Sequence, residues 1–274
     1  MPELPEVETR VRELRTPCVG RTIVRAAVRW PRHIATSSAA HFRNRIRGQS
    51  IDGMERRGKY LVFKLSADYL LVHLRMSGDL RVVDLPEPLG KHDHTTFEFD
   101  NGTELRFSDA RKFGRVYLAN HPEDILGHLG PEPLAAGFAS SEFAARVLAR
   151  KRQIKPLLLD QTFLAGVGNI YADESLHRAG VHPEKTSNTL TVVQARGLWR
   201  SVRQVLREGI RRNGASIDWV YRGGRQQNHF RVYGRADEPC LKCGTPIQRI
   251  VVGQRSTYFC PHCQPASRVG IGDD

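Results

Sequence analysis

Four cysteines near the carboxyl end stand in two pairs, Cys240-x2-Cys243 and Cys260-x2-Cys263, with 16 residues between the pairs. Two such pairs supply the four thiolates of a tetrahedral structural Zn2+ site and leave no position for a substrate. Four unrelated thiols are the alternative, which this spacing disfavours. Cys18 stands alone, and we expect it to be inert. The sequence predicts one structural zinc ion per chain, in a module that folds only with its metal.

The amino terminus, MPELPEVETR, places proline directly behind the initiator methionine. Removal of Met1 would leave Pro2 with a secondary amine, and an α-amino group has a pKa of about 7.7 to 8.0, so much of it is an unprotonated nucleophile at neutral pH. Its attack on the anomeric carbon of a sugar would give a cationic imine, which also favours elimination of a neighbouring phosphate. Glu3 could supply a proton if burial raises the pKa of its carboxyl. A simple helix start is the alternative, and without further support it is the stronger one.

Two further segments suit phosphate binding. Gly166 and Gly168 precede Asn169, which is a good helix N-cap, and the exposed N–H groups of such a helix start attract anions. Arg255 lies in GQRSTYF, between the cysteine pairs, where a guanidinium could grip a phosphate with two parallel donors. An ordinary capped helix and a solvated surface arginine are the respective alternatives.

The charge of the chain favours a polyanionic partner. It has 42 Lys+Arg against 29 Asp+Glu, a formal net charge of +13, and nucleic acid is the leading candidate. A membrane surface is the rival, but no apolar run approaches the roughly 18 to 20 residues that span a bilayer. Glutamates also occupy the place of the apolar core of a signal peptide, so we expect a cytoplasmic protein.

Hydrophobic periodicity changes along the chain. Val7, Val11 and Leu14 recur at helical spacing, and residues 21–118 then alternate as strands do, with a hairpin turn expected at Asn101-Gly102. After HLGPEPL, residues 128–134, the apolar spacing becomes helical. It predicts helices in SSEFAARVLARK, KPLLLDQTFLAG, NIYADESLHRAG and TVVQARGLWRSVRQVLREGIRRNG. A leading helix, a β-sandwich or barrel, a helical region and the cysteine module therefore follow one another.

Together these segments resemble one family closely, the bacterial formamidopyrimidine-DNA glycosylases, which excise oxidised purines and nick the resulting abasic site. The resemblance runs in order through MPELPEVETR, RRGKYL, HLRMSGDL, KHDHTTFEF, SDARKFG, HLGPEPL, IKPLLLDQ, GVGNIYADESL and VYGR to the zinc module. It implies an α+β fold and a monomer acting on damaged double-stranded DNA. The implied domains are a catalytic β-sandwich with a leading helix (2–130), a helix-two-turn-helix domain (131–228) and a zinc-finger β-hairpin (229–267).

The resemblance also implies roles for single residues. Pro2 resembles the Schiff-base nucleophile and Glu3 the general acid, with Glu6 supporting this centre. Lys59 resembles the lysine assigned to β-elimination and Arg255 the arginine credited with δ-elimination, although Lys59 alone could be a surface lysine at a strand edge. Positions that resemble DNA contacts are His92, Arg150, Lys155 and Asn169, together with Met76, Arg111 and Phe113, which fill the space left by an everted nucleotide.

The last three positions also make physical sense. An apolar wedge offsets lost base stacking, and an arginine can hydrogen-bond the orphaned cytosine. Read alone, Met76 and Phe113 would more often be core residues.

Residues 215–231 depart from the family pattern. This segment is shorter and richer in arginine, where well-known members have a loop that closes over the flipped base, so formamidopyrimidines could be preferred to 8-oxoguanine. Two alternatives stay open. One is an endonuclease VIII-type glycosylase for oxidised pyrimidines, against which Leu4 and the Met76, Arg111 and Phe113 set argue. The other is a zinc-finger DNA-binding protein without catalysis, which would need neither a free Pro2 nor Glu3.

Overall fold

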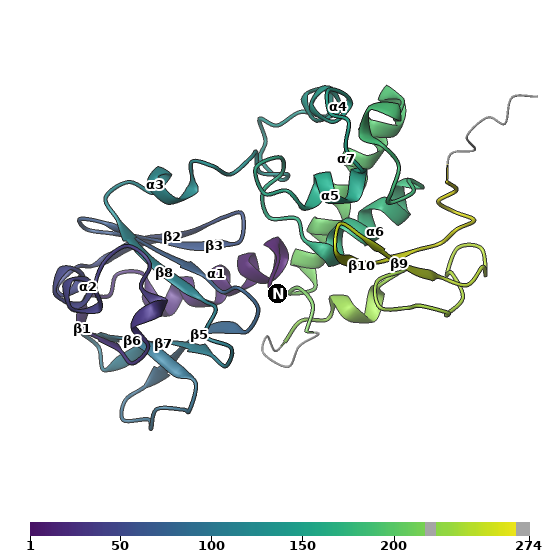
Figure 1. The fold of residues 1–274 in the computed structure, drawn as a ribbon. Coiled ribbons are helices and arrows are strands. Elements are labelled where there is room, and N and C mark those ends of the chain that lie inside the picture. Colours follow the sequence, from purple (N-terminus) through teal and green to yellow (C-terminus); the bar gives the residue numbers. More distant parts are fainter. Residues whose placement is uncertain (217–222, 267–274) are drawn as a thin grey trace, which may run out of the picture. The chain divides into compact units, whose positions relative to one another are not determined.

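A computed structural model describes residues 1–216 and 223–266 of the chain (Figure 1). The chain divides into two compact units. The first comprises residues 1–128 and 212–225, and the second comprises residues 129–211 and those from 226 onward. Each unit is described by itself below, and the division into three domains stays a prediction.

Two four-stranded antiparallel sheets form the body of the first unit (Figure 1). They confirm the predicted β-sandwich. One sheet has the order β1 (Ile23–Val28), β6 (Asp93–Phe99), β7 (Thr103–Asp109) and β5 (Gly78–Asp84), and the other β2 (Ile51–Arg57), β3 (Tyr60–Leu65), β4 (Tyr69–His73) and β8 (Arg115–Ala119).

The leading helix α1 (Leu4–Cys18) packs into the core of this sandwich. Its Val7, Val11 and Leu14 are buried and belong to one hydrophobic cluster with side chains of both sheets, such as Phe63 and Phe97. The helical spacing of these residues is therefore the reason why α1 turns one face inward. Helix α1 is held against the strands by the burial of that face.

Several local features differ from the expectations. Helix α2 (Ala39–Ile46) interrupts the region expected to be strands, because Phe42 and Ile46 give it one buried turn. The turn at Asn101-Gly102 belongs to a longer connection, since the last pair of the β6–β7 register is Glu98 with Glu104. Short helices are also present at α3 (Glu123–Leu126) and η1 (Pro31–His33).

The second unit is helical and ends in a two-stranded hairpin (Figure 1). The predicted helix in KPLLLDQTFLAG ends early, at Leu159, because the Asp160 carboxylate accepts hydrogen bonds from the backbone and hydroxyl of Thr162. The elements are α4 (Ser140–Leu148), α5 (Ile154–Leu159), α6 (Asn169–Ala179), η2 (Ser187–Thr189), α7 (Val192–Arg211), η3 (Gln226–His229), β9 (Gln248–Val252) and β10 (Arg255–Phe259).

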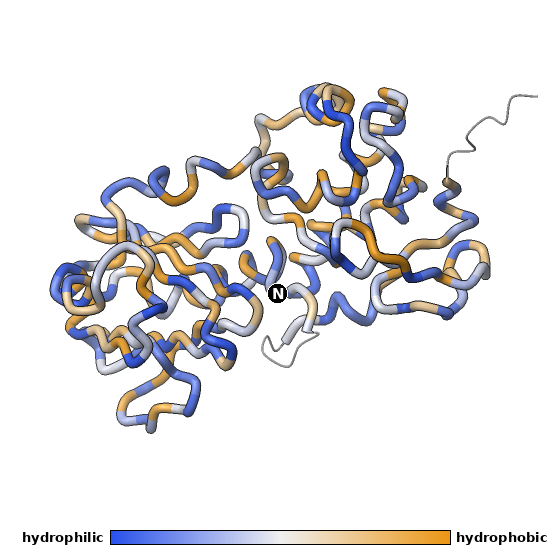
Figure 2. Tube along the Cα trace, in the orientation of Figure 1, coloured by the Kyte–Doolittle hydropathy of each residue, from blue (hydrophilic) through white to orange (hydrophobic). Residues whose placement is uncertain are grey.

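Hydrophobic and hydrophilic residues are interspersed along the chain (Figure 2). Helix α7 buries Leu198, Val202 and Leu206 on one face and carries arginines elsewhere. Within residues 1–216 and 223–266, no helix is long and apolar enough to cross a membrane.

Candidate active site and zinc centre

The start of α1 holds two buried glutamates. Glu3 is the N-cap, Pro5 lies in the first turn, and the Glu6 carboxylate accepts the N–H of Glu3 at 2.9 Å, as in a capping box. Glu3 and Glu6 are each 3% exposed. The helix start expected as the simpler alternative is therefore present, and it fixes the backbone directly behind Pro2.

The second oxygen of Glu6 reaches a distant segment of the same unit. Glu6 Oε1 accepts the N–H of Ala215 at 2.8 Å. Gly214 takes a φ of +72°, and a Cβ there would lie 2.7 Å from Glu6 Oε1. A buried carboxylate needs such donors because desolvation is costly without them. Glu6 thus joins the start of α1 to residues 214–215, a contact that sequence reasoning missed. The one local signal in this region was the Asn213-Gly214 pair, which indicates a turn after a helix.

Lys59 lies in the turn between β2 and β3 and is 6% exposed, so it is not a surface lysine. Arg56 connects this turn to α1. Its Nε lies 3.2 Å from Glu8 Oε2, and its Nη1 donates to the carbonyl oxygen of Gly58 at 3.1 Å. Helix α1 therefore positions both the Pro2–Glu3 pair and the turn that carries Lys59.

His73, at the end of β4, is a neighbour that the sequence did not reveal. It is buried, and burial together with the positive charges of Arg75 and Lys59 lowers the pKa of His73 to about 3. Its Nδ1 accepts the N–H of Arg75 at 3.0 Å. The imidazole is therefore neutral at pH 7 and adds no second cation beside Lys59.

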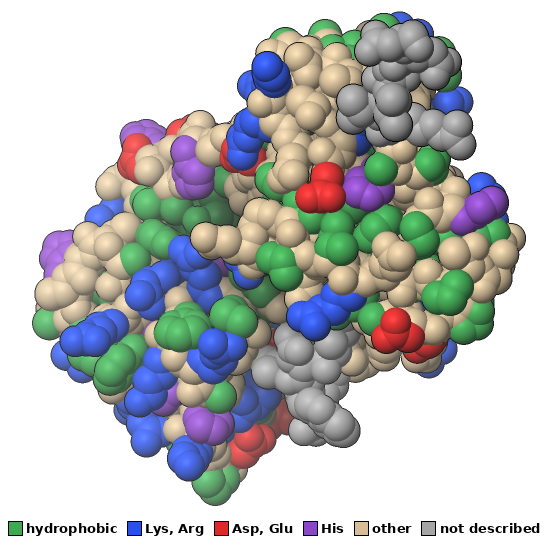
Figure 3. Space-filling model, turned by 45° about the vertical axis from the view of Figure 1, so that its right-hand side comes forward, with side chains coloured by type: hydrophobic (Ala, Val, Ile, Leu, Met, Phe, Trp, Pro, Cys, Tyr) green, Lys and Arg blue, Asp and Glu red, His purple; other side chains and the backbone are tan. Residues whose placement is uncertain are grey.

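Met76, Arg111 and Phe113 lie on two neighbouring loops of the first unit. Met76 is 41% exposed and Phe113 is 48% exposed, so neither is a core residue. The Arg111 guanidinium lies 5.0 Å from the centre of the Phe113 ring. His92 is exposed. It lies near these loops, because its carbonyl oxygen accepts the N–H of Asp109 at 2.9 Å. Figure 3 shows Lys and Arg side chains gathered among hydrophobic ones on a face of this unit.

In the second unit, α5, α6 and β10 bring three predicted residues together. Asn169 Nδ2 and Lys155 Nζ both donate to the carbonyl oxygen of Ser256, at 2.9 Å and 3.0 Å. Ser256 directly follows Arg255, which is exposed at the start of β10. Gly168 is the N-cap of α6, one position before the expected Asn169, so the Asn169 side chain is used for this link.

Lys155 is fully buried. Its ammonium lies 2.7 Å from the Asp173 carboxylate and 2.7 Å from the Thr257 hydroxyl. This placement favours support of β10 over the direct DNA contact that the resemblance implies. Arg150 lies elsewhere in the unit, with its guanidinium 5.1 Å from the centre of the Phe163 ring.

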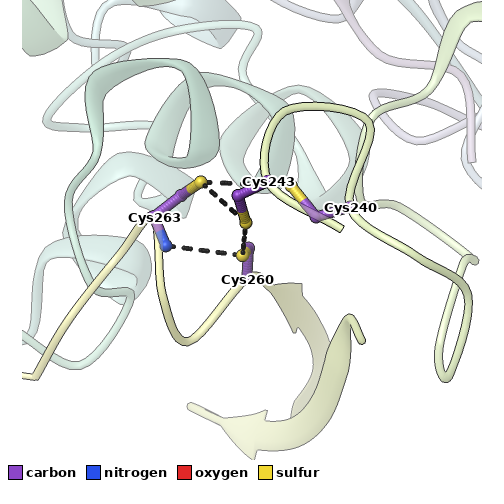
Figure 4. Close-up of side chains that lie close together, drawn as sticks. All are labelled: Cys240, Cys243, Cys260 and Cys263. Atoms are coloured by element: carbon purple, nitrogen blue, oxygen red, sulfur yellow. Dashed lines mark hydrogen bonds between the residues drawn. The ribbon is translucent and has the colours of Figure 1, made fainter. Parts of the chain in front are cut away.

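The four clustered cysteines form a site for one zinc ion (Figure 4). Their Sγ atoms all lie within 4.8 Å of one another, and Cys243 Sγ lies 3.5 Å from Cys260 Sγ and 3.5 Å from Cys263 Sγ. A tetrahedral ion with Zn–S bonds of about 2.3 Å requires sulfur separations of about 3.8 Å, which these distances approach. His177 of α6 adds a contact, with Nε2 3.5 Å from Cys240 Sγ. The predicted zinc site is confirmed.

Comparison with known proteins gives the family. The model of the formamidopyrimidine-DNA glycosylase N-terminal domain matches residues 1–116, that of its H2TH domain matches residues 129–220, and that of the zinc finger found in FPG and IleRS matches residues 237–266. A formamidopyrimidine-DNA glycosylase of Herpetosiphon aurantiacus is 45% identical over 272 residues, covering 96% of this chain and 100% of the relative. The chain belongs to the formamidopyrimidine-DNA glycosylase family.

Solved structures of this family are similar throughout. MutM in complex with DNA containing carbocyclic 8-oxo-G matches with a TM-score of 0.91 and 39% identity, over 97% of this chain and 100% of that one. The Lactococcus lactis Fpg bound to abasic-site DNA matches with a TM-score of 0.90 and 38% identity, over 96% and 100%. The predicted family and fold are therefore confirmed, and the chain is a DNA glycosylase.

Proposed function

We propose that this formamidopyrimidine-DNA glycosylase family member excises formamidopyrimidines and 8-oxoguanine from duplex DNA and then cleaves the abasic site by β,δ-elimination. The observation that carries the proposal is the buried Glu3, held by the capping box directly behind Pro2. The ligands of the two solved relatives, an 8-oxoguanine analogue and an abasic site, support the substrate and the second step. We further propose a bacterial cytoplasmic monomer.

The glycosylase step uses Pro2 after removal of Met1. The Pro2 nitrogen forms a bond to the anomeric carbon while the glycosidic bond breaks, and the departing base takes up the proton that the amine gives up. Glu3 then donates its proton to the ring oxygen of the sugar. The ring opens to a cationic imine that joins protein and DNA. After this step the carboxylate of Glu3 must regain a proton from solvent before the next turnover.

The lyase step follows from the charge of that imine. It acidifies the neighbouring sugar carbon, and loss of the proton there expels the 3′ phosphate; a second elimination expels the 5′ phosphate. We assign Lys59 to the first phosphate, because it is a buried cation in the turn that Arg56 connects to α1, and the neighbouring His73 is neutral. Arg255 is assigned to the second, since it is exposed on a hairpin that the zinc site holds in place.

DNA binding is assigned to exposed side chains of the first unit and to the half-buried Arg150 and Asn169 of the second. Met76 and Phe113 would replace the stacking of the everted nucleotide, and Arg111 would hydrogen-bond the opposite base. His92, Arg150 and Asn169 would contact the backbone. The loop whose composition departs from the family lies partly in residues 217–222, outside the described residues.

A panel of lesions tests the substrate. We expect the chain to release 8-oxoguanine opposite cytosine and a formamidopyrimidine at least about tenfold faster than an oxidised thymine, a difference of about 1.4 kcal/mol in transition-state free energy. Single-turnover rates on matched duplexes measure it. Faster release of the thymine lesion would favour the endonuclease VIII-type alternative. Binding without release of any base would favour the non-catalytic zinc-finger protein.

A further inference from the structure

Asp109 ends β7 and is fully buried. Its Oδ2 accepts the N–H of Gly114 at 2.6 Å, and its Oδ1 accepts the N–H of Arg111 at 3.2 Å. The same Oδ1 accepts the hydroxyl of Ser77, whose oxygen in turn accepts the N–H of Arg111 at 3.0 Å. One buried carboxylate therefore holds two loops, residues 75–78 with Met76 and residues 110–114 with Arg111 and Phe113.

The ring of Phe107 joins the same two loops a second time. A Cβ added to Gly114 would lie 2.3 Å from Phe107 Cζ, and one added to Gly78 would lie 2.8 Å from Phe107 Cε2. Gly78 is also the partner of Asp109 in the β5–β7 register. The loops are thus packed against one side chain as well as hydrogen-bonded to another.

His33 closes the inner side of this cluster. Its ring centre lies 4.9 Å from that of Phe107, and its Nε2 lies 3.8 Å from Asp109 Oδ2. Burial lowers the pKa of His33 to about 4, with the Lys112 and Arg115 cations and His94 acting in the same direction and Asp109 opposing. The imidazole is neutral at pH 7, so the N–H and O–H donors of the two loops stabilise the Asp109 charge.

We propose that Ser77 and Asp109 form a latch that makes the Met76 loop and the Arg111–Phe113 loop enter DNA as one body. This inference rests on the proposed function, which assigns these side chains to the place of the everted nucleotide. An apolar wedge must enter the base stack as the lesion leaves it. Independent loops could insert one at a time, and Arg111 would then not hydrogen-bond the opposite base. Ser77 and Asp109 are positioning residues, because they are buried and act through their exposed neighbours.

The variant Ser77→Ala tests the latch. It removes the bond between the loops but leaves Asp109 its bonds to the N–H groups of Arg111 and Gly114. We expect excision of 8-oxoguanine opposite cytosine to fall about tenfold to a hundredfold, the effect of losing one hydrogen bond to a charged group. Cleavage of a pre-formed abasic site should change by less than about threefold, because no base has to be everted. The ratio of the excision rates opposite cytosine and opposite adenine should move closer to one.

Further variants separate the latch from a general loss of structure. Ser108→Ala removes a half-buried hydroxyl from β7, outside the latch, and should leave both rates unchanged. Ser77→Cys keeps the size of the side chain and has a weaker donor, so its excision rate should fall by less than that of Ser77→Ala. This variant keeps the proposal testable if the alanine variant unfolds. In a double-mutant cycle, Met76→Ala should lower the excision rate by less in the Ser77→Ala background than in the wild type, since both changes act on the same wedge.

Three results would overturn the latch. The first is an unchanged rate of excision by Ser77→Ala. The second is an equal loss of rate on 8-oxoguanine opposite cytosine and on the abasic site. The third is additive losses of excision rate in the cycle with Met76→Ala. None of them touches the proposed function, which is tested separately on the wild-type protein by its release of 8-oxoguanine.

Discussion

Replacing Glu3 with glutamine should lower the rate of 8-oxoguanine excision by about 100-fold to 10,000-fold, the range for loss of a general acid. Glutamine keeps the size of the side chain and an oxygen for the helix start, but it has no proton to give. Cleavage of a pre-formed abasic site should be retained, because its aldehyde reacts with Pro2 without protonation of a base or ring oxygen. Single-turnover rates on the two substrates measure the split.

Glu13→Gln is the matched control for this prediction. Glu13 lies on the same helix but pairs with Arg10 at its exposed side, so both rates should stay near those of the wild type. If Glu3→Gln lowered the two rates equally, the role of Glu3 would be structural, and if it lowered neither, another acid would serve.

Replacing Gly214 with alanine should displace Glu6 and with it the start of α1. The methyl group would stand 2.7 Å from Glu6 Oε1 and 3.1 Å from its Cα, at a φ of +72°. The backbone strain costs about 1 to 2 kcal/mol, and a displacement of about 1 Å at a reacting group can cost a hundredfold in rate. We therefore expect a lower free energy of unfolding and about a hundredfold slower excision. Chemical denaturation and single-turnover kinetics measure the two effects.

Gly102→Ala separates the strain from the contact. Gly102 has a φ of +79° but nothing within 4 Å of its added Cβ. It should lose stability to a similar degree and keep the excision rate. Equal rates in Gly102→Ala and Gly214→Ala would show that the contact between Gly214 and Glu6 has no part in catalysis.

Local patterns predicted most of the fold. The three-residue and four-residue spacing in α1, α6 and α7 is a property of single segments, so the sequence contains it. Strands β3 and β4 were also predicted, although they are buried on both faces and do not alternate. The zinc site was predictable for the same reason, since each Cys-x2-Cys pair is a local turn. Helix α2 was missed because its Phe42 and Ile46 provide too short a pattern among strands.

The parts of the site that were missed depend on distant contacts. Glu6 and Ala215 are 209 positions apart. The Asn213-Gly214 pair indicates a turn after the helix, but it does not indicate that the turn contacts Glu6. The neutral state of His73 is a consequence of burial, which the sequence around it does not specify. Lys155 resembles a DNA contact by motif, yet its ion pair with Asp173 becomes visible only when α5, α6 and β10 pack together. A motif identifies a residue more readily than it identifies what that residue touches.

The central claim is that Pro2 becomes the nucleophile. Borohydride reduction during reaction with abasic-site DNA should trap a covalent complex, and peptide mass spectrometry should place the sugar on the nitrogen of Pro2 in protein from which Met1 has been removed. Protein that retains Met1 should not be trapped. A crosslink on any other residue, such as Lys59, or the absence of a trapped complex would contradict the account.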